Sequence, residues 1–219
     1  MIDIQVISLG YVNAFVINSS ILVDTGTKSC GEKILSQLRA LNIAPTDIKL
    51  IILTHGHDDH IGSVPELVAA TGAKVLISRL EYEQIKLGLA DEIKPQTALM
   101  KLFYAFKKDK RVVKQNKDFK ADIIIDEPFD LKPYGADGKI LLTPGHSKGS
   151  VSVLLDDAAI IGDNLMAFSK APKMPFIAYD NALIKTSMNG LIQSGAKKFY
   201  LSHGGVYGLD LVEEALRQM

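Results

Sequence analysis

The sequence predicts one layered α/β domain that spans residues 1–219. Short strand-like runs and helix-like patterns are mixed in both halves of the chain, which favours layers of sheet and helix around a shared core. In addition, no obvious linker divides the 219 residues, a length that suits one large domain or two small ones. The hydrophobic fraction of 47% and the 17 glycines are ordinary for a globular protein.

The N-terminal third predicts strands followed by two helices. Apolar or β-branched runs at 2–6, 14–17 and 21–23 indicate strands bounded by Gly, Asn and Ser. Ser29 and Glu32 have capping-box spacing, so we expect a helix from there to about residue 41, before Pro45. A buried strand follows at 50–53 because the run is short and apolar on both faces. Ser63 and Glu66 repeat the capping-box spacing, and Gly72 offers a stop for that second helix.

The middle of the chain predicts helix over residues 79–112, with a break at Pro95. Residues 101–120 hold eight Lys or Arg against two acids, whereas 122–130 is acidic. The simpler interpretation is a solvated helix face. The alternative is a lid that carries cations towards an anionic substrate.

The second half returns to strands at 139–142, 151–155, 158–161 and 198–201. Helices are expected at about 181–194 and from about Leu209 onward.

Charge and composition exclude or weaken several function classes. The 25 basic residues balance the 25 acidic residues, whereas a general nucleic-acid binder is usually distinctly basic. No stretch approaches the roughly 18 apolar residues of a membrane helix, and the N-terminus does not resemble a signal peptide. The single cysteine, Cys30, cannot form an internal disulfide, which fits a reducing compartment. We therefore expect a cytoplasmic protein with a small-molecule substrate, and no nucleic-acid or membrane partner.

All five histidines lie where metal ligands would be expected, because neutral imidazole is a good nitrogen ligand near pH 7. Three of them fall between residues 55 and 60 together with two aspartates. Four apolar runs each end within a few residues of a candidate ligand, and strand ends are where α/β sheets gather functional loops. The candidates are His55, His57, Asp59, His60, His146, Asp163 and His203.

Seven side chains are too many for one tetrahedral ion. They suit two ions about 3.5–4 Å apart, bridged by a carboxylate and a water-derived hydroxide. Ligands with nitrogen and oxygen but no thiolate favour Zn²⁺, with Fe²⁺ or Mn²⁺ as alternatives. A structural metal site would normally be closed with four ligands, so the pattern favours a catalytic centre.

These motifs resemble the metallo-β-lactamase superfamily of hydrolases. The segment His55 to His60 matches its H-x-H-x-D-H motif, and His146, Asp163 and His203 match its later ligand motifs in order. Asp24 matches the early aspartate motif that lies beside the metals in the family. The resemblance spans residues 12–204 and implies a four-layered αβ/βα sandwich with the metals at one edge of the paired sheets.

The resemblance also implies a role for each residue. One metal would be held by His55, His57 and His146. The other would be held by Asp59, His60 and His203, with Asp163 bridging both. Asp59 would in addition act catalytically, orienting the hydroxide and transferring its proton. Asp24 and Asp58 are the candidates to orient ligands through hydrogen bonds, and Asp24 is the better one.

Within the superfamily, the motifs look closest to the glyoxalase II-like and lactonase-like branches. Asn13, the His146 loop and residues 149–151 resemble the thioester hydrolases, but the C-terminal helical domain of glyoxalase II is missing. Lactonases share all seven ligands but usually place a tyrosine soon after the bridging aspartate, where this chain has Met166 and Phe168. Asp163 in place of a cysteine, together with the Asp59–His60 pair, argues against an antibiotic-hydrolysing enzyme.

The function expected from these observations is hydrolysis of an ester-like bond, a thioester or a lactone, by a dinuclear centre. The alternatives are an iron-dependent sulfur dioxygenase and a phosphodiesterase or nuclease of the same superfamily. Pocket walls are expected from residues 79–112 and 168–179, since loops set specificity on such scaffolds. The apolar block at 171–176 is expected to line either the site or a homodimer contact, and both alternatives stay open.

Overall fold

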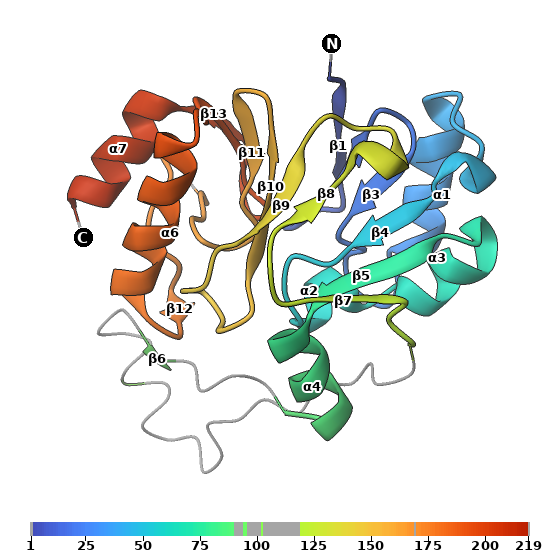
Figure 1. The fold of residues 1–219 in the computed structure, drawn as a ribbon, viewed down its shortest axis with the longest axis horizontal. Helices are drawn as coiled ribbons and strands as arrows, with labels where there is room; N and C mark the ends of the chain where they lie inside the picture. The colour runs from blue at the N-terminus through green and yellow to red at the C-terminus, as the bar shows by residue number, and fades with distance from the viewer. Residues whose placement is uncertain (1, 90–93, 96–101, 103–118, 169, 219) are drawn as a thin grey trace.

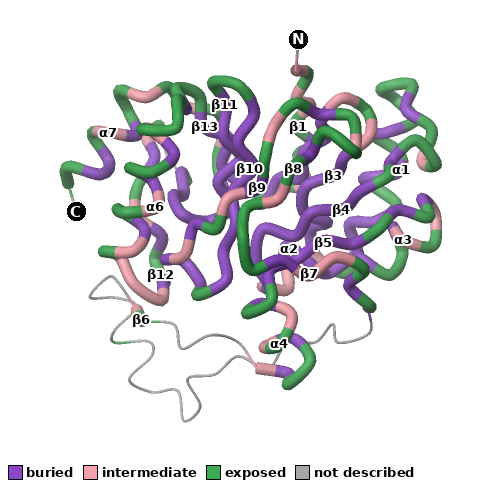
Figure 2. Tube along the Cα trace, viewed as in Figure 1, coloured by how far each residue is buried: buried purple, intermediate pink, exposed green. Residues whose placement is uncertain are grey.

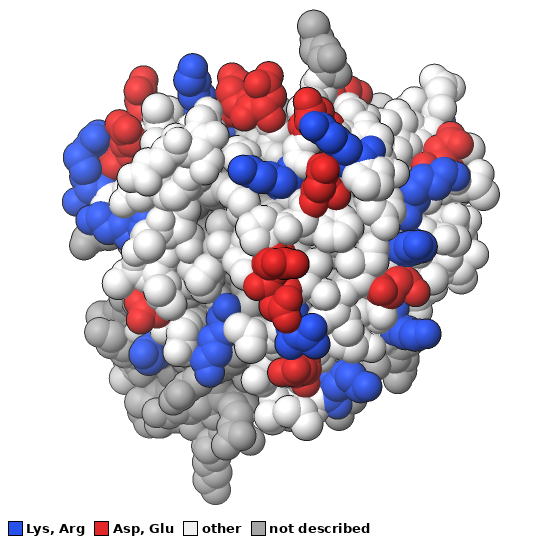
Figure 3. Space-filling view, viewed as in Figure 1, with Lys and Arg blue, Asp and Glu red and all other residues white. Residues whose placement is uncertain are grey.

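The computed structural model describes residues 2–89, 94–95, 102, 119–168 and 170–218. Two six-stranded sheets stand face to face at the centre, and helices cover the outer face of each (Figure 1). The predicted four-layered αβ/βα sandwich is therefore confirmed. On the face shown in Figure 3, Lys and Arg are interspersed with Asp and Glu, so that face carries both signs of charge.

The first sheet has the order β1-β2-β3-β4-β5-β7. Its first three strands pair antiparallel, and β3, β4, β5 and β7 run parallel. The bounds are Ile4–Ser8 (β1), Asn13–Ile17 (β2), Ile21–Val23 (β3), Leu50–Ile52 (β4), Lys74–Ser78 (β5) and Ile123–Ile125 (β7). Helices α1 (Gly31–Ala40) and α3 (Val64–Thr71) pack on its outer face, while α2 (Asp58–Ile61) and α4 (Arg79–Leu87) lie at the lower edge in Figure 1.

The second sheet has the order β14-β13-β11-β10-β9-β8 and is antiparallel except for the β11–β13 pair. Its bounds are Phe129–Asp130 (β8), Lys139–Leu142 (β9), Val151–Leu155 (β10), Ala158–Ile160 (β11), Lys198–Tyr200 (β13) and Val206–Gly208 (β14). Helices α6 (Asn181–Gln193) and α7 (Leu209–Arg217) cover it. A small sheet pairs β6 (Lys94–Pro95) with β12 (Ile177–Ala178), and short 3₁₀ helices lie at Pro45–Asp47 and Lys132–Tyr134.

Three hydrophobic cores separate the four layers, and the central strands are buried on both faces (Figure 2). In β4, Ile51 packs towards α1 and α3, whereas Leu50 and Ile52 pack between the two sheets. In β10, Val153 faces the space between the sheets and Leu154 faces α6 and α7. The side-chain period of two therefore serves two cores at once, which explains why β4 is a continuous apolar run and β10 is apolar except for Ser152.

Most predicted elements are confirmed, with three corrections. The N-terminal strand lies at Ile4–Ser8 rather than 2–6. Neither predicted capping box forms. Helix α1 is capped by Cys30 without a side-chain hydrogen bond, and the hydroxyl of Ser63 donates to the Thr27 carbonyl instead. Ser63 Oγ also accepts a hydrogen bond from the Cys30 amide, so tertiary contacts between the starts of α1 and α3 use the oxygen that a capping box would need.

The helix predicted over 79–112 is confirmed for its first turns but ends before the predicted break at Pro95. Helix α4 ends at Leu87, where Gly88 takes a left-handed conformation with φ of 67°. Lys94 and Pro95 belong to a strand. Apart from Leu89, Leu102, Phe119 and Lys120, the other residues of the predicted helix and of the basic stretch, for which a lid was the alternative, lie outside the described residues. Among the described helices, each is too short or too polar to cross a bilayer.

Candidate metal centre

Strand direction brings the predicted ligands to one edge of the sandwich. Because β3, β4 and β5 are parallel, the segments that follow them leave the first sheet at the same edge. In the second sheet, β9 and β11 are both antiparallel to β10, and β13 is parallel to β11, so the loops after these three strands also share an edge. The loops from both sheets meet there.

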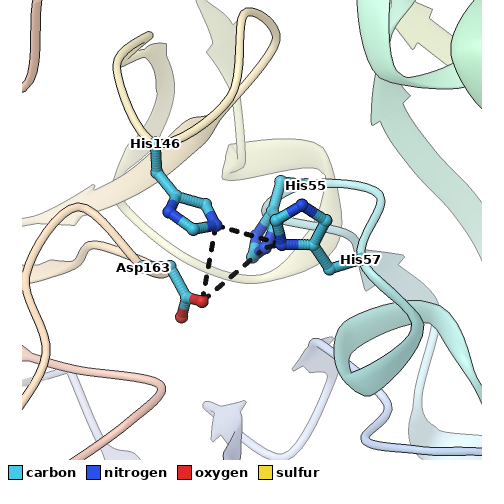
Figure 4. Close-up of side chains that lie close together, drawn as sticks. All are labelled: His55, His57, His146 and Asp163. Carbon is cyan, nitrogen blue, oxygen red and sulfur yellow. Dashed lines mark hydrogen bonds and ion pairs between the residues drawn. The ribbon is translucent and has the colours of Figure 1, made fainter. Parts of the chain in front are cut away.

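All seven predicted ligands converge in two adjacent groups. The first group holds His55, His57, His146 and Asp163, and the second holds Asp59, His60 and His203. Within each group, one donor atom per residue lies within 4.8 Å of every other. Figure 4 shows the first group, with three imidazoles and the carboxylate pointing towards a common centre.

Nitrogen atoms crowd the centre of the first group. His57 Nδ1 lies 2.9 Å from His55 Nε2 and 3.0 Å from His146 Nε2. Asp163 Oδ2 lies 3.8 Å from His55 Nε2 and 3.6 Å from His146 Nε2. Four ligands about 2.0–2.2 Å from a tetrahedral zinc ion lie about 3.3–3.6 Å from one another. The donor set therefore has the spacing that one cation requires.

Asp163 lies between the two groups and contacts both. Besides its contacts in the first group, its Oδ1 lies 3.5 Å from His60 Nε2, and its Oδ2 lies 3.4 Å from His203 Nε2. Asp59 completes the second group, with 3.7 Å to His60 Nε2 and 3.3 Å to His203 Nε2. One carboxylate thus faces four imidazoles, as a bridging ligand would.

Among the ligand residues, three buried atoms lack the partners that buried polar atoms normally have: His146 Nδ1 and two atoms inside the centre. His60 Nε2 and Asp163 Oδ1 form no hydrogen bond within the described part of the chain, although they face each other. An unsatisfied buried polar atom is costly, so such atoms are rare without a functional reason. Together with the converging nitrogens, they show that the residues present fit a pair of bound cations.

Hydrogen bonds to the outer nitrogen atoms of two imidazoles orient the second group. His60 Nδ1 lies 2.8 Å from Asp24 Oδ2, and His203 Nδ1 lies 2.7 Å from the backbone carbonyl of Tyr11. With the proton of each ring on Nδ1, donated to these oxygens, Nε2 keeps its lone pair facing the cluster. The ligand nitrogen of both histidines is therefore selected by their outer partners.

Asp24 is the anchor of this arrangement, as the sequence predicted. It is fully buried, and its carboxylate also accepts hydrogen bonds from the amide and hydroxyl of Thr54, both at 2.8 Å. Its φ of 60° is left-handed, a conformation that Asp tolerates better than most residues. Asp58, the weaker candidate, begins α2 and is partly buried, and its orienting role stays a prediction.

The neighbouring charges set the protonation of the metal-free centre. Burial lowers the pKa of His55 well below its usual value, and the neighbouring histidines act in the same direction. Burial also lowers the pKa of His60 and His203, but the facing carboxylates outweigh it. They raise the pKa of His60 well above its usual value and that of His203 to about 10. Burial raises the pKa of Asp59, but His203 and His60 outweigh it and bring that pKa down to about 2.

Glu81 is a site residue that the sequence analysis missed. It is buried at the start of α4 and accepts hydrogen bonds from the Gly56 amide at 2.6 Å and the Gly149 amide at 3.1 Å. It therefore connects the loop of His55 and His57 to the loop of His146. The acid lies in a region predicted only as helix, and nothing in its local pattern distinguishes it from a solvated helix residue.

The motif residues that resemble those of glyoxalase II form hydrogen bonds that hold the loops of the site. Asn13 donates to the carbonyls of Leu201 and Gly204, which holds the loop of His203. Within the His146 loop, Ser147 and Ser150 hydrogen-bond to each other through their hydroxyls at 2.6 Å. These contacts lie within the protein itself. They account for the motif residues without reference to a substrate.

Aromatic side chains border the second group. The ring of Tyr11 stacks on His203 with centroids 5.8 Å apart, and the ring of Phe168 lies 5.7 Å from the same imidazole. Both aromatic residues are 59% exposed. Phe168 belongs to the segment predicted as a pocket wall. The position of Tyr11 beside His203 was not predicted from the sequence.

Comparison with known proteins gives a consistent result. The family model described as "Metallo-beta-lactamase superfamily" matches residues 7–203. The metallo-beta-lactamase fold-containing protein ST1585 of Sulfurisphaera tokodaii is 30% identical over 202 residues, 87% of this chain and 76% of that protein. A probable metallo-hydrolase of Methanocaldococcus jannaschii, MJ0296, is 29% identical over 85% of this chain and 71% of that protein.

Solved structures agree with this. The crystal structure of ST1585 superposes with a TM-score of 0.66 at 25% identity, covering 98% of this chain and 85% of that one. The B3 metallo-beta-lactamase BLEG-1 superposes with a TM-score of 0.67 and covers 97% of both chains, but its 20% identity shows the shared fold alone. From the family model and these relatives, the chain belongs to the metallo-β-lactamase superfamily.

Proposed function

We propose that the protein is a hydrolase that uses two divalent cations to cleave an ester-like bond, a thioester or a lactone, in a small molecule. The observation that carries the proposal is the pair of ligand groups that share Asp163. The name of the relative MJ0296, a probable metallo-hydrolase, supports the reaction class.

The ligand assignment follows the two groups. His55, His57 and His146 would hold one cation, Asp59, His60 and His203 the other, and Asp163 both. Imidazole and carboxylate ligands favour Zn²⁺, with Fe²⁺ or Mn²⁺ as alternatives. When bound, such a pair supplies Lewis-acid activation of water and of the substrate carbonyl at neutral pH.

The chain itself contributes positioning and a route for the proton. Asp59 is the more exposed carboxylate of the cluster, with 25% of its side chain accessible against 3% for Asp163. It can therefore accept the proton of the attacking water and pass it to the leaving group. The water oxygen bonds to the carbonyl carbon, the bond from that carbon to sulfur or oxygen breaks, and the leaving atom takes the proton. No protein nucleophile is needed.

The test combines metal analysis with a substrate panel. The purified protein is analysed for metal and is then reconstituted separately with Zn²⁺ and with Fe²⁺. Each form is assayed on thioesters, lactones, bis(p-nitrophenyl) phosphate and, in the presence of oxygen, a persulfide. Two ions per chain with turnover of a thioester or lactone are expected. One iron per chain with oxygen-dependent oxidation of a persulfide would replace the hydrolase by a sulfur dioxygenase. Turnover of the phosphodiester alone would replace it by a phosphodiesterase.

A further inference from the structure

An apolar groove begins beside the metal centre. It encloses about 440 Å³. Its lining consists of Met166, Phe168, Lys173, Met174 and Phe176 from the loop after Asp163, Ala215 of α7 and Gln218 just after that helix. Small-molecule pockets usually enclose about 300–1,000 Å³ and are mostly apolar. The groove thus has the size and character of a ligand pocket.

One residue, Phe168, belongs both to the lining of the groove and to the border of the centre. Phe168 lines the groove, and its ring lies 5.7 Å from the ring of His203. The ring of Phe168 also stacks on that of Phe176, with centroids 5.4 Å apart and planes 14° from parallel. A molecule bound in the groove would therefore be separated from the second group of metal-ligating residues by the ring of Phe168.

The loop is fastened to the centre at this point. The Ala167 amide donates to the His203 carbonyl at 2.7 Å, and Met166 pairs with Lys173 in an antiparallel bridge. A Cβ on Gly204 would lie 2.9 Å from the Cβ of Ala167, so glycine allows the loop of His203 to approach this closely. The position of the groove relative to the centre is therefore set by backbone contacts.

The exposed rings need an explanation. Phe168 is 59% exposed and Phe176 is 48% exposed, although burial of apolar area gains about 25 cal/mol per Å². Contiguous exposed apolar surface typically marks a binding site. Another hollow, of about 450 Å³, is lined by residues of β8, β9 and β10 and of the turns beside them. Its lining includes Asp130, Lys132 and Asp156 and neither of the aromatic residues that border the centre.

We propose that this groove binds the apolar acyl chain of the substrate whose carbonyl is cleaved at the centre. The substrate class is then an acyl thioester or a lactone with an alkyl or aryl side chain. This inference rests on the proposed hydrolase function. A substrate chain fits better than a second copy of the protein because the groove has the volume of a ligand pocket and shares Phe168 with the border of the centre.

The first experiment measures chain-length dependence. Acetyl, butanoyl, hexanoyl and octanoyl thioesters of one thiol are compared with the Zn²⁺-loaded enzyme. We expect kcat/KM to rise about three- to fourfold for each methylene until the groove is filled. Phe176→Ala should lose more activity on the octanoyl than on the acetyl substrate. Leu41→Ala, at an exposed apolar residue just after α1, is the control and should keep the full length dependence.

The second experiment detects binding without catalysis. The chain contains no tryptophan, so Phe176→Trp introduces a single fluorescent reporter into the groove. With and without chelator, 1-octanol should shift its emission saturably, whereas ethanol should not.

Three outcomes separate the inference from the proposed function. Turnover that does not depend on chain length would overturn the inference and leave the hydrolase intact. Emission that responds to protein concentration, with dimers seen by sedimentation, and not to octanol would assign the groove to a homodimer contact and also overturn it. If no ester or thioester is cleaved, the proposed function fails, and the octanol titration alone decides whether the groove binds apolar chains.

Discussion

The two halves of the sandwich supply the candidate site in different ways. The N-terminal half contributes His55, His57, Asp59 and His60 from one short segment after β4. The C-terminal half contributes His146, Asp163 and His203 singly, from loops after β9, β11 and β13. The first set is close because it is local in sequence. The second set is close only because three strands end at one edge.

The hydrogen bonds that hold the two sets of ligands in place also differ: those of the first set are local, and those of the second cross between the halves. Asp24 and Thr25, from the same half, hold His60 and the backbone of α2. By contrast, the C-terminal loops depend on bonds across the halves. The Tyr11 carbonyl accepts a hydrogen bond from His203 Nδ1, and the Asn13 side chain donates to the carbonyls of residues 201 and 204. The Thr54 carbonyl accepts a hydrogen bond from the Val151 amide. The N-terminal half thus offers a preformed part of the site, and the C-terminal part depends on how the halves pack.

The largest effect is expected at the residue that joins the two sets. Asp163→Asn removes one charge that faces four imidazoles, so we expect loss of bound metal and a fall in kcat/KM of more than about 100-fold, beyond what loss of an outer partner costs. Metal content and steady-state kinetics measure this. Asp156→Asn makes the same change at an exposed turn and should behave as wild type. Full metal content with normal activity in Asp163→Asn would refute the bridging role.

Removal of the metal should destabilise the whole sandwich, because ions held by the two ligand groups would connect both halves. Cations at 100 times their dissociation constant stabilise the folded state by about 2.7 kcal/mol. Chelation should lower Tm accordingly, and Zn²⁺ should restore it, whereas Mg²⁺, which prefers oxygen ligands, should not. Calorimetry with and without chelator is the measurement. An unchanged Tm would mean that the clustered residues hold no ion.

Within the N-terminal half, Asp24→Asn tests the orientation of His60. Asparagine tolerates the left-handed backbone but presents an N–H group to partners that are all donors. Metal affinity or activity should fall about 10- to 100-fold, as is typical for an outer partner. Asp3→Asn, at an exposed position, is the matched control. Equal affinity and activity in both variants would show that Asp24 supports only the fold.

Between the halves, Glu81→Gln tests the connection of the two histidine loops. One of its two acceptor oxygens becomes an N–H group facing a backbone amide, so we expect a loss of about 1–3 kcal/mol in the free energy of unfolding. Urea unfolding measures it. Glu83→Gln, exposed on the same helix, should change stability little. A similar loss in both variants would contradict a special role for Glu81.

The smallest effect is the pH dependence of the metal-free protein. The pKa of His203 is raised to about 10, so its contribution is complete below 6.5 and is lost as the pH rises through about 10. Asp59, with its pKa lowered to about 2, contributes above 3.8 and loses this only in strong acid. Chelated protein should therefore lose Tm between pH 7 and pH 10, and His203→Gln should lose less. A Tm that rises over this range would contradict the assigned charges.

Much of the fold follows from local patterns. Strands such as β4 and β10 are recognisable because burial on both faces favours apolar residues, with Ser152 the one polar residue in the two strands. The elements in the middle of the chain were harder to predict from the sequence. The end of α4 depends on Gly88 in a left-handed conformation, and β5 forms because a parallel neighbour is available in β4. The sequence of Lys74–Ser78 alone does not reveal that a parallel neighbour is available.

The sequence by itself determined the chemistry of the centre. The types and spacing of His55 to His60, and the order of His146, Asp163 and His203, specify a nitrogen- and carboxylate-rich cluster before any fold is known. Only the tertiary structure decided which residues orient that cluster and what borders it. Glu81, the Tyr11 carbonyl and the groove at Phe168 act through contacts between segments far apart in the chain, and such contacts leave no periodic signal in the sequence.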